Sequence, residues 1–135
     1  MKKIVILLIV TIVSVVAVYA QDVKWPRQLT HGGHVLTVYQ PQVHTWDKHQ
    51  HIDFRTAFSL VPSGGKEVLG VLYMEARTNT DIESHVVKVD SMRIKDVHFP
   101  SLPPDSVKLM AQRVRQFLTP DRFLLISVEQ IVTYL

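Results

Sequence analysis

Histidine is the residue type with the clearest potential for chemistry in this sequence. The chain has seven histidines, and His44, His49 and His51 fall within eight residues of one another. A His-x-His pair at the start of a strand would place both rings on one face, a ligand spacing that zinc sites use. Histidines in a polar stretch, however, are more often solvated surface residues. We therefore expect no metal site, and a metal-dependent enzyme that uses His44–His51 remains an alternative.

Other patterns typical of catalysis are missing from the sequence. It contains no Gly-x-Ser-x-Gly, no His-Glu-x-x-His and no glycine-rich loop that could hold a phosphate. It also has no cysteine, which excludes thiol catalysis and thiolate metal sites. Glu75 and Arg77 would share one face of a strand, where we expect an ordinary structural ion pair or a solvated face. These observations predict that the chain is not an enzyme and needs no cofactor.

Aromatic residues are the candidates for ligand binding. Trp25, Tyr39 and Trp46 lie near one another in the sequence, beside prolines and the amide side chains of Gln40 and Gln42. Flat rings beside amide groups could stack against a sugar or hold a peptide. In the alternative interpretation the two tryptophans only close the ends of the core, because large aromatics supply much of the buried area of a small domain.

The elements that position these residues follow from the hydrophobic pattern. Alternation of apolar and polar residues predicts strands, and Pro62-Ser63-Gly64-Gly65 predicts the turn of a β-hairpin. Residues 21–33 are expected to be irregular, and the last long strand is expected to bend near Asp90-Ser91. The expected strands span residues 34–40, 51–61, 68–78, 85–99 and 122–126, and the expected helices span 105–118 and 128–135.

Strands that precede helices in this way predict an α+β fold. We expect an antiparallel sheet of four or five strands, followed by one or two helices packed on one face. Ser127 and Gln130 form a capping box at the start of the last helix. Residues 21–135 are long enough for one domain, which could also be the first domain of a longer protein.

The first twenty residues have the features of a secretory signal peptide. Lys2 and Lys3 precede an apolar run that ends in Val-Tyr-Ala, with small residues at the positions that a cleavage after Ala20 requires. The run is shorter than the roughly 20 apolar residues of a membrane-spanning helix. We expect a periplasmic or secreted protein, and an uncleaved N-terminal anchor in the inner membrane is the alternative.

Charge and cysteine content narrow the class of partner. The formal net charge of +3 falls to +1 without Lys2 and Lys3, which leaves thirteen Lys and Arg against twelve Asp and Glu. A nearly neutral domain lacks the basic surface that nucleic-acid binding requires. An exported domain without disulfides must be held together by its core alone, which suits a bacterial periplasm.

Several short motifs carry a resemblance to a known group of proteins. Together they resemble the N-terminal region of a family of exported bacterial proteins that are sometimes labelled carbohydrate-binding family V/XII. The motifs occupy residues 25–27, 38–42, 70–77, 97–100 and 127–131. The resemblance covers nearly all of residues 21–135 and implies that the chain corresponds to the opening domain of longer proteins. It implies no particular binding residue.

These observations predict an exported, non-catalytic recognition or assembly module of the bacterial cell envelope, whose partner is an envelope protein or a glycan. Carbohydrate binding through Trp25, Tyr39 and Trp46 is the first alternative. The metal-dependent enzyme is the second. No nucleic acid is expected as a partner, and a membrane is expected to be contacted only through the N-terminal segment.

Overall fold

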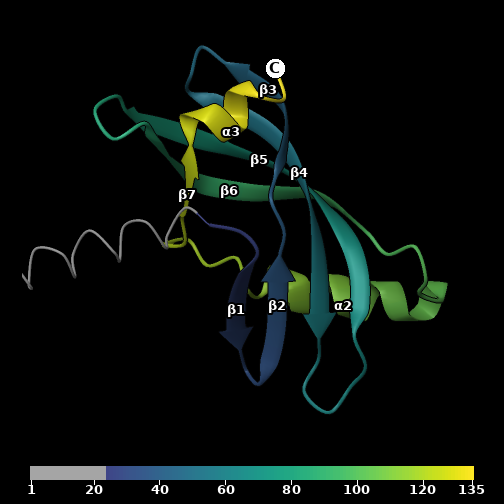
Figure 1. Ribbon diagram of the computed structural model, residues 1–135. Coiled ribbons are helices and arrows are strands. Elements are labelled where there is room, and N and C mark those ends of the chain that lie inside the picture. Colours follow the sequence, from purple (N-terminus) through teal and green to yellow (C-terminus); the bar gives the residue numbers. More distant parts are fainter. Residues whose placement is uncertain (1–23) are drawn as a thin grey trace, which may run out of the picture.

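A computed structural model describes residues 24–135, so the predicted signal peptide lies outside the described residues. All the strands belong to one antiparallel sheet, which curls around the core (Figure 1). The strands are β1 (Arg27–His31), β2 (His34–Val38), β3 (Gln42–Asp47), β4 (His51–Val61), β5 (Val68–Asp81), β6 (Val86–His98) and β7 (Leu124–Ser127), and the helices are α2 (Pro104–Arg115) and α3 (Val128–Val132).

The predicted α+β class is wrong. The structure is 52% sheet and only 15% helix, and six strands form a curled antiparallel half-barrel in the order β1-β2-β4-β5-β6-β7. Within residues 24–135, the remaining strand, β3, pairs only with β4 and is not part of this order. The expected sheet of four or five strands with helices on one face is therefore replaced by a half-barrel. Side chains of α2 and of the residues after it fill its concave side.

The two strands that the sequence analysis missed explain most of this difference. Residues Gly32 and Gly33 both have positive φ values, 57° and 79°, and form a two-residue turn between the paired residues His31 and His34. Such a turn is typical of a β-hairpin, so the segment expected to be irregular contains β1. Strand β3 follows Pro41, and its mostly polar sequence gives little hydrophobic alternation.

Strands β2 and β3 lie end to end along β4. Val38 pairs with Phe58 in the second half of β4, whereas Gln42 pairs with Arg55 in the first half. The chain leaves the sheet between them, at residues 39–41. Pro41 has no N–H to donate, which is compatible with an interruption of the ladder here.

The three longest strands, β4, β5 and β6, lie where the hydrophobic pattern predicts them. Strand β4 has the predicted bounds, and β5 begins at Val68 as predicted but continues to Asp81. The predicted bend in β6 is confirmed, because Ser91 has a positive φ of 49° and the β5–β6 register shifts at the facing residues.

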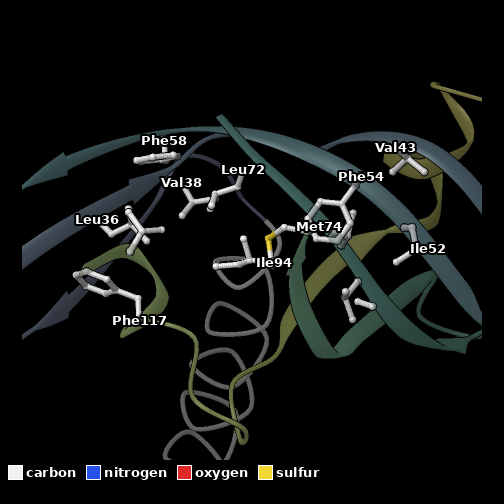
Figure 2. Close-up of a cluster of buried hydrophobic side chains, with 14 of the residues drawn as sticks. Leu36, Val38, Val43, Ile52, Phe54, Phe58, Leu72, Met74, Ile94 and Phe117 are labelled. Atoms are coloured by element: carbon white, nitrogen blue, oxygen red, sulfur yellow. The ribbon is translucent and has the colours of Figure 1, made fainter. Parts of the chain in front are cut away.

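The core consists of the side chains on the inner face of the half-barrel and of those that the helices and the segments beside α2 pack against them. Figure 2 shows Phe54, Phe58 and Met74 on this face, with Phe117 from the segment after α2 packed against Leu36. Phe58 and Phe117 are each 1% exposed. The predicted cap of the last helix is present only in part. The Ser127 hydroxyl accepts a hydrogen bond from the Gln130 N–H, but the buried Gln130 side-chain oxygen has no partner among the described residues.

No helix in the described part of the chain is long and apolar enough to cross a membrane.

Candidate ligand-binding groove

The outer face of the sheet, which points away from the core, carries a groove of about 570 Å³. We call it the aromatic groove. It is lined by Trp25, Pro26, Tyr39, Gln40, Gln42, Arg55, Ala57, Val71, Tyr73 and Tyr134.

Strands β4 and β5 form the floor of the aromatic groove. Ala57 and Val71 pair directly across the two strands, and Arg55 and Tyr73 form the next pair on the same face. Residues that pair directly across an antiparallel sheet point to the same side. Because Ala57 is small and lies beside Arg55 and opposite Val71, the floor is hollow between larger side chains.

Tyr39 lies where the chain leaves β2, and its backbone is held against β4 on both sides. Its N–H donates to the Ala57 carbonyl at 3.0 Å, and its own carbonyl accepts from the Thr56 hydroxyl at 2.6 Å. Thr56 is only 2% exposed, so this hydrogen bond satisfies a buried hydroxyl as well. The backbone of Tyr39 is thus fixed by β4, although its side chain is 43% exposed.

Trp25 also lines the aromatic groove, and its ring is in contact with Arg27. The guanidinium of Arg27 lies 3.8 Å from the centre of the Trp25 ring, which is the geometry of a cation–π contact. Arg27 also donates to the carbonyl of Lys24 at 3.0 Å and to the carbonyl of Leu125 in β7. The indole N–H of Trp25 is buried and has no hydrogen-bond partner among residues 24–135.

Arg55 supplies the only charged side chain in the described lining of the aromatic groove. Its Nε donates to Gln42 Oε1 at 2.9 Å, which orients the guanidinium. The nearest carboxylate on the same strand face, Asp53, is already occupied. It accepts from Lys95 at 3.2 Å and from Thr45 at 3.0 Å.

The environment of Asp53 also determines its protonation. Partial burial raises the pKa of its carboxyl group, but the hydrogen bonds from Lys95 and Thr45 and the positive charge of Lys95 outweigh this effect. The pKa of Asp53 therefore lies below its usual range. The carboxylate stays ionised and bound to Lys95 at neutral pH.

The structure brings together two of the three aromatic residues that the sequence singled out. Trp25 and Tyr39 both line the aromatic groove. Trp46 lies elsewhere, because its Nε1 donates to the Thr78 hydroxyl at 2.9 Å and its ring packs on His49 and on the edge of the core. Both tryptophans are partly buried and packed against the core, and only Trp25 also lines the groove.

The histidines do not form the arrangement that a zinc site would need. His49 lies in the turn before β4 with a φ of 56°, not in the strand, so the expectation that it shares a face with His51 is wrong. His51 lies 3.7 Å from Asp53 and 3.8 Å from Glu75, and His44 is exposed on β3. Among residues 24–135, no three His, Asp or Glu side chains are placed to hold a metal ion together.

Of the two arrangements expected for Glu75 and Arg77, the ion pair is not formed. Glu75 pairs instead with Arg93 on the neighbouring strand β6, which faces it directly in the register. A cross-strand neighbour lies closer than a residue two positions along the same strand, so the sheet pairing decides the partner.

Sequence reasoning missed Arg55, Tyr73 and Tyr134 as residues of the groove. A signal for the first two was present. Arg55 and Tyr73 are equidistant from Gly64 at the predicted hairpin turn, so a symmetric register would have placed them side by side. Tyr134 follows α3, and no local pattern links that segment to the outer face of β4 and β5.

The aromatic groove thus combines flat rings, two amide side chains and one cation. Rings stack on flat apolar surfaces, and amides can both donate and accept hydrogen bonds. This set of residues suits the binding of a ligand with apolar faces and hydroxyl edges. No protein-family model, curated protein or solved structure matches the chain.

Proposed function

We propose that the chain is a non-catalytic recognition module of the bacterial cell envelope that binds a glycan in the aromatic groove. The observation that supports this most directly is the convergence of Trp25 and three tyrosines on one groove that also contains Gln40 and Gln42. Sugars present C–H faces that stack on aromatic rings and hydroxyl groups that bond to amides, so both kinds of side chain have a use here.

The size and exposure of the site support the same proposal. A groove of about 570 Å³ falls within the range of about 300–1,000 Å³ that is typical of small-molecule sites. The residues Tyr39, Tyr73 and Tyr134 are 43%, 37% and 41% exposed, so a ligand can reach them. Their positions are supported by the sheet, because Tyr73 belongs to β5 and the Tyr39 backbone is bonded to β4.

The motifs that carry the family resemblance supply most of the groove. Residues 25–27, 38–42 and 70–77 contribute seven of its ten lining residues. The resemblance to exported bacterial proteins and the leader sequence together support a role in the cell envelope.

Tryptophan fluorescence provides a sharp test because the chain has only two tryptophans. Titration with a panel of cell-wall and plant oligosaccharides is expected to shift the emission, and the shift should come from Trp25. A Trp46→Phe variant should therefore keep the shift, whereas a Trp25→Phe variant should lose it.

Binding is then measured by calorimetry in a Tyr39→Ala variant. We expect the affinity to fall by roughly 5- to 150-fold, if a sugar that stacks on the ring gains about the 1–3 kcal/mol that a stacked nucleic-acid base gains. Phe123→Ala is the matched control, because Phe123 is also exposed (49%) but lies outside the groove. A panel in which no glycan binds, or equal losses in both variants, would refute the proposal.

A further inference from the structure

We infer that the aromatic groove selects a glycan that carries a carboxylate, that is, one that contains a hexuronic acid, and that Arg55 binds this carboxylate. The inference rests on the proposed function and names the class of glycan. It follows from the charge of the groove, from the partners of the nearby carboxylates and from the orientation of the Arg55 guanidinium.

The groove has an uncompensated positive charge. Arg55 is the charged side chain of the described lining, and the other nine lining residues are aromatic, amide or apolar. Within residues 24–135, Arg55 makes no ion pair, although other cations of the same sheet face do: Arg93 pairs with Glu75, and Lys95 pairs with Asp53.

The carboxylates nearest to Arg55 are not placed to neutralise it. Asp53 lies two positions away on β4 and is bonded to Lys95 and Thr45. Asp96 pairs with Tyr73 across β5 and β6, so Tyr73 separates it from Arg55, which pairs with Tyr73 on the other side. Asp96 does not belong to the groove lining. The charge of Arg55 is therefore available to a ligand.

The orientation of Arg55 suits a carboxylate. Its Nε is engaged with Gln42 Oε1 at 2.9 Å, which leaves the two terminal nitrogens as a pair of donors. Two parallel N–H groups match the two oxygens of a carboxylate. Because Gln42 already holds the guanidinium, less side-chain entropy is lost when the ligand binds.

Rings and cation together favour a sugar acid over a simple anion. A free carboxylate would gain only the contact with Arg55, which is solvent-exposed and therefore weak by itself. A neutral sugar would gain only the contacts with the rings and amides. A hexuronic acid can use both, since its carboxylate is attached to the ring that stacks.

The test compares tetragalacturonate with its methyl ester, which has the same sugar rings without the charges. Calorimetric titration of the purified protein is expected to show that the acid binds about tenfold more tightly than the ester, the effect of one charge-assisted hydrogen-bonded contact. This preference should weaken at high salt because the contact is exposed.

Variants assign the preference to Arg55. Arg55→Gln should lose the preference and bind acid and ester with equal affinity. Arg77→Gln is the matched control, because Arg77 is also an exposed arginine of the sheet but does not line the groove. It should keep the full preference. Circular dichroism checks that both variants are folded.

Two results would overturn the inference while the proposed function stands: equal binding of acid and ester by the unaltered protein, or equal losses of preference in the Arg55 and Arg77 variants. Failure of the proposed function itself looks different. In that case neither galacturonate ligand binds, and no other glycan of the wider panel shifts the fluorescence of Trp25.

Discussion

Replacement of Gly70 by alanine tests the packing that supports the floor of the aromatic groove. Gly70 pairs with Phe58 across β4 and β5, directly before Val71. A Cβ at position 70 would lie 2.4 and 2.7 Å from the Phe58 ring carbons Cζ and Cε1, and 2.8 Å from the carbonyl oxygen of His98. Ordinary contacts of a Cβ are 3.4–4 Å, so the alanine variant must displace the ring and the neighbouring strand.

The displacement is costly because Phe58 has no free space to move into. Phe58 is 1% exposed, and its ring makes an edge-to-face contact with the ring of Phe99, with 5.6 Å between the ring centres. Overpacking of a core typically costs about 1–3 kcal/mol, and the reduced freedom of the unfolded chain returns about 0.4–1 kcal/mol. We expect Gly70→Ala to lower the free energy of unfolding by about 1–2 kcal/mol.

Denaturation with urea measures this change as a shift in the midpoint at constant slope. Gly65→Ala is the control, because a Cβ there would meet only Pro62, at 3.3 Å, and Gly65 does not have a positive φ. The control should change the free energy of unfolding by less than about 0.5 kcal/mol.

A double variant identifies the cause. Phe58→Leu removes the two ring carbons that clash, so Gly70→Ala should cost less in that background than alone, with a coupling of about 1 kcal/mol. Strict additivity of the two changes, or a cost of Gly70→Ala no larger than that of the control, would show that the contact with Phe58 is not the constraint.

Three further variants test the groove and its surroundings. Thr56→Val removes the buried hydroxyl that bonds to the Tyr39 carbonyl, so stability should fall by about 1–2 kcal/mol in urea denaturation and glycan affinity should fall with it; unchanged affinity would show that Tyr39 is held by other contacts. Ala57→Phe should fill the floor and abolish binding in calorimetry while the unfolding midpoint hardly moves; retained binding would place the ligand elsewhere. Asp53 has a pKa below its unfolded value, so its contribution to stability is present above the ordinary aspartate pKa of about 3.9 and is lost as the pH falls through its folded pKa. Asp53→Asn should therefore be less stable than the unaltered protein near neutral pH, with a difference that shrinks in acid; a difference independent of pH would contradict the pairing with Lys95.

The sequence was sufficient to predict elements whose signals are local. Strand β4 alternates apolar and polar residues along its length, and Pro62–Gly65 provides the turn to β5, so both were located correctly. The missed strands lack such signals. Strand β1 is short, and only the hairpin turn at Gly32-Gly33 indicates it. Strand β3 is largely polar, because most of its residues are exposed.

The curl of the sheet could not be predicted in the same way. It depends on which strands pair: among the described residues, one edge of β4 pairs with β2 and then with β3, whereas the other edge pairs with β5 alone. The candidate site was found in part, because Trp25 and Tyr39 stand out by residue type. Tyr73 and Arg55 become neighbours through the register of β4 and β5, which follows from the position of the turn at Gly64 and not from the two residue types. Trp46 has the same residue type as Trp25 and also packs against the core, but only Trp25 lines the groove.

Arg27 joins two parts of the molecule that the sheet itself does not join. It stacks on Trp25 at the groove and donates to the carbonyl of Leu125 in β7, at the opposite edge of the half-barrel from β1. A ligand that stacks on Trp25 would restrict the motion of Arg27 and so stabilise the contact between β1 and β7. Ligand binding in the groove should then slow the exchange of the backbone amide hydrogens in β7, which lies outside the groove.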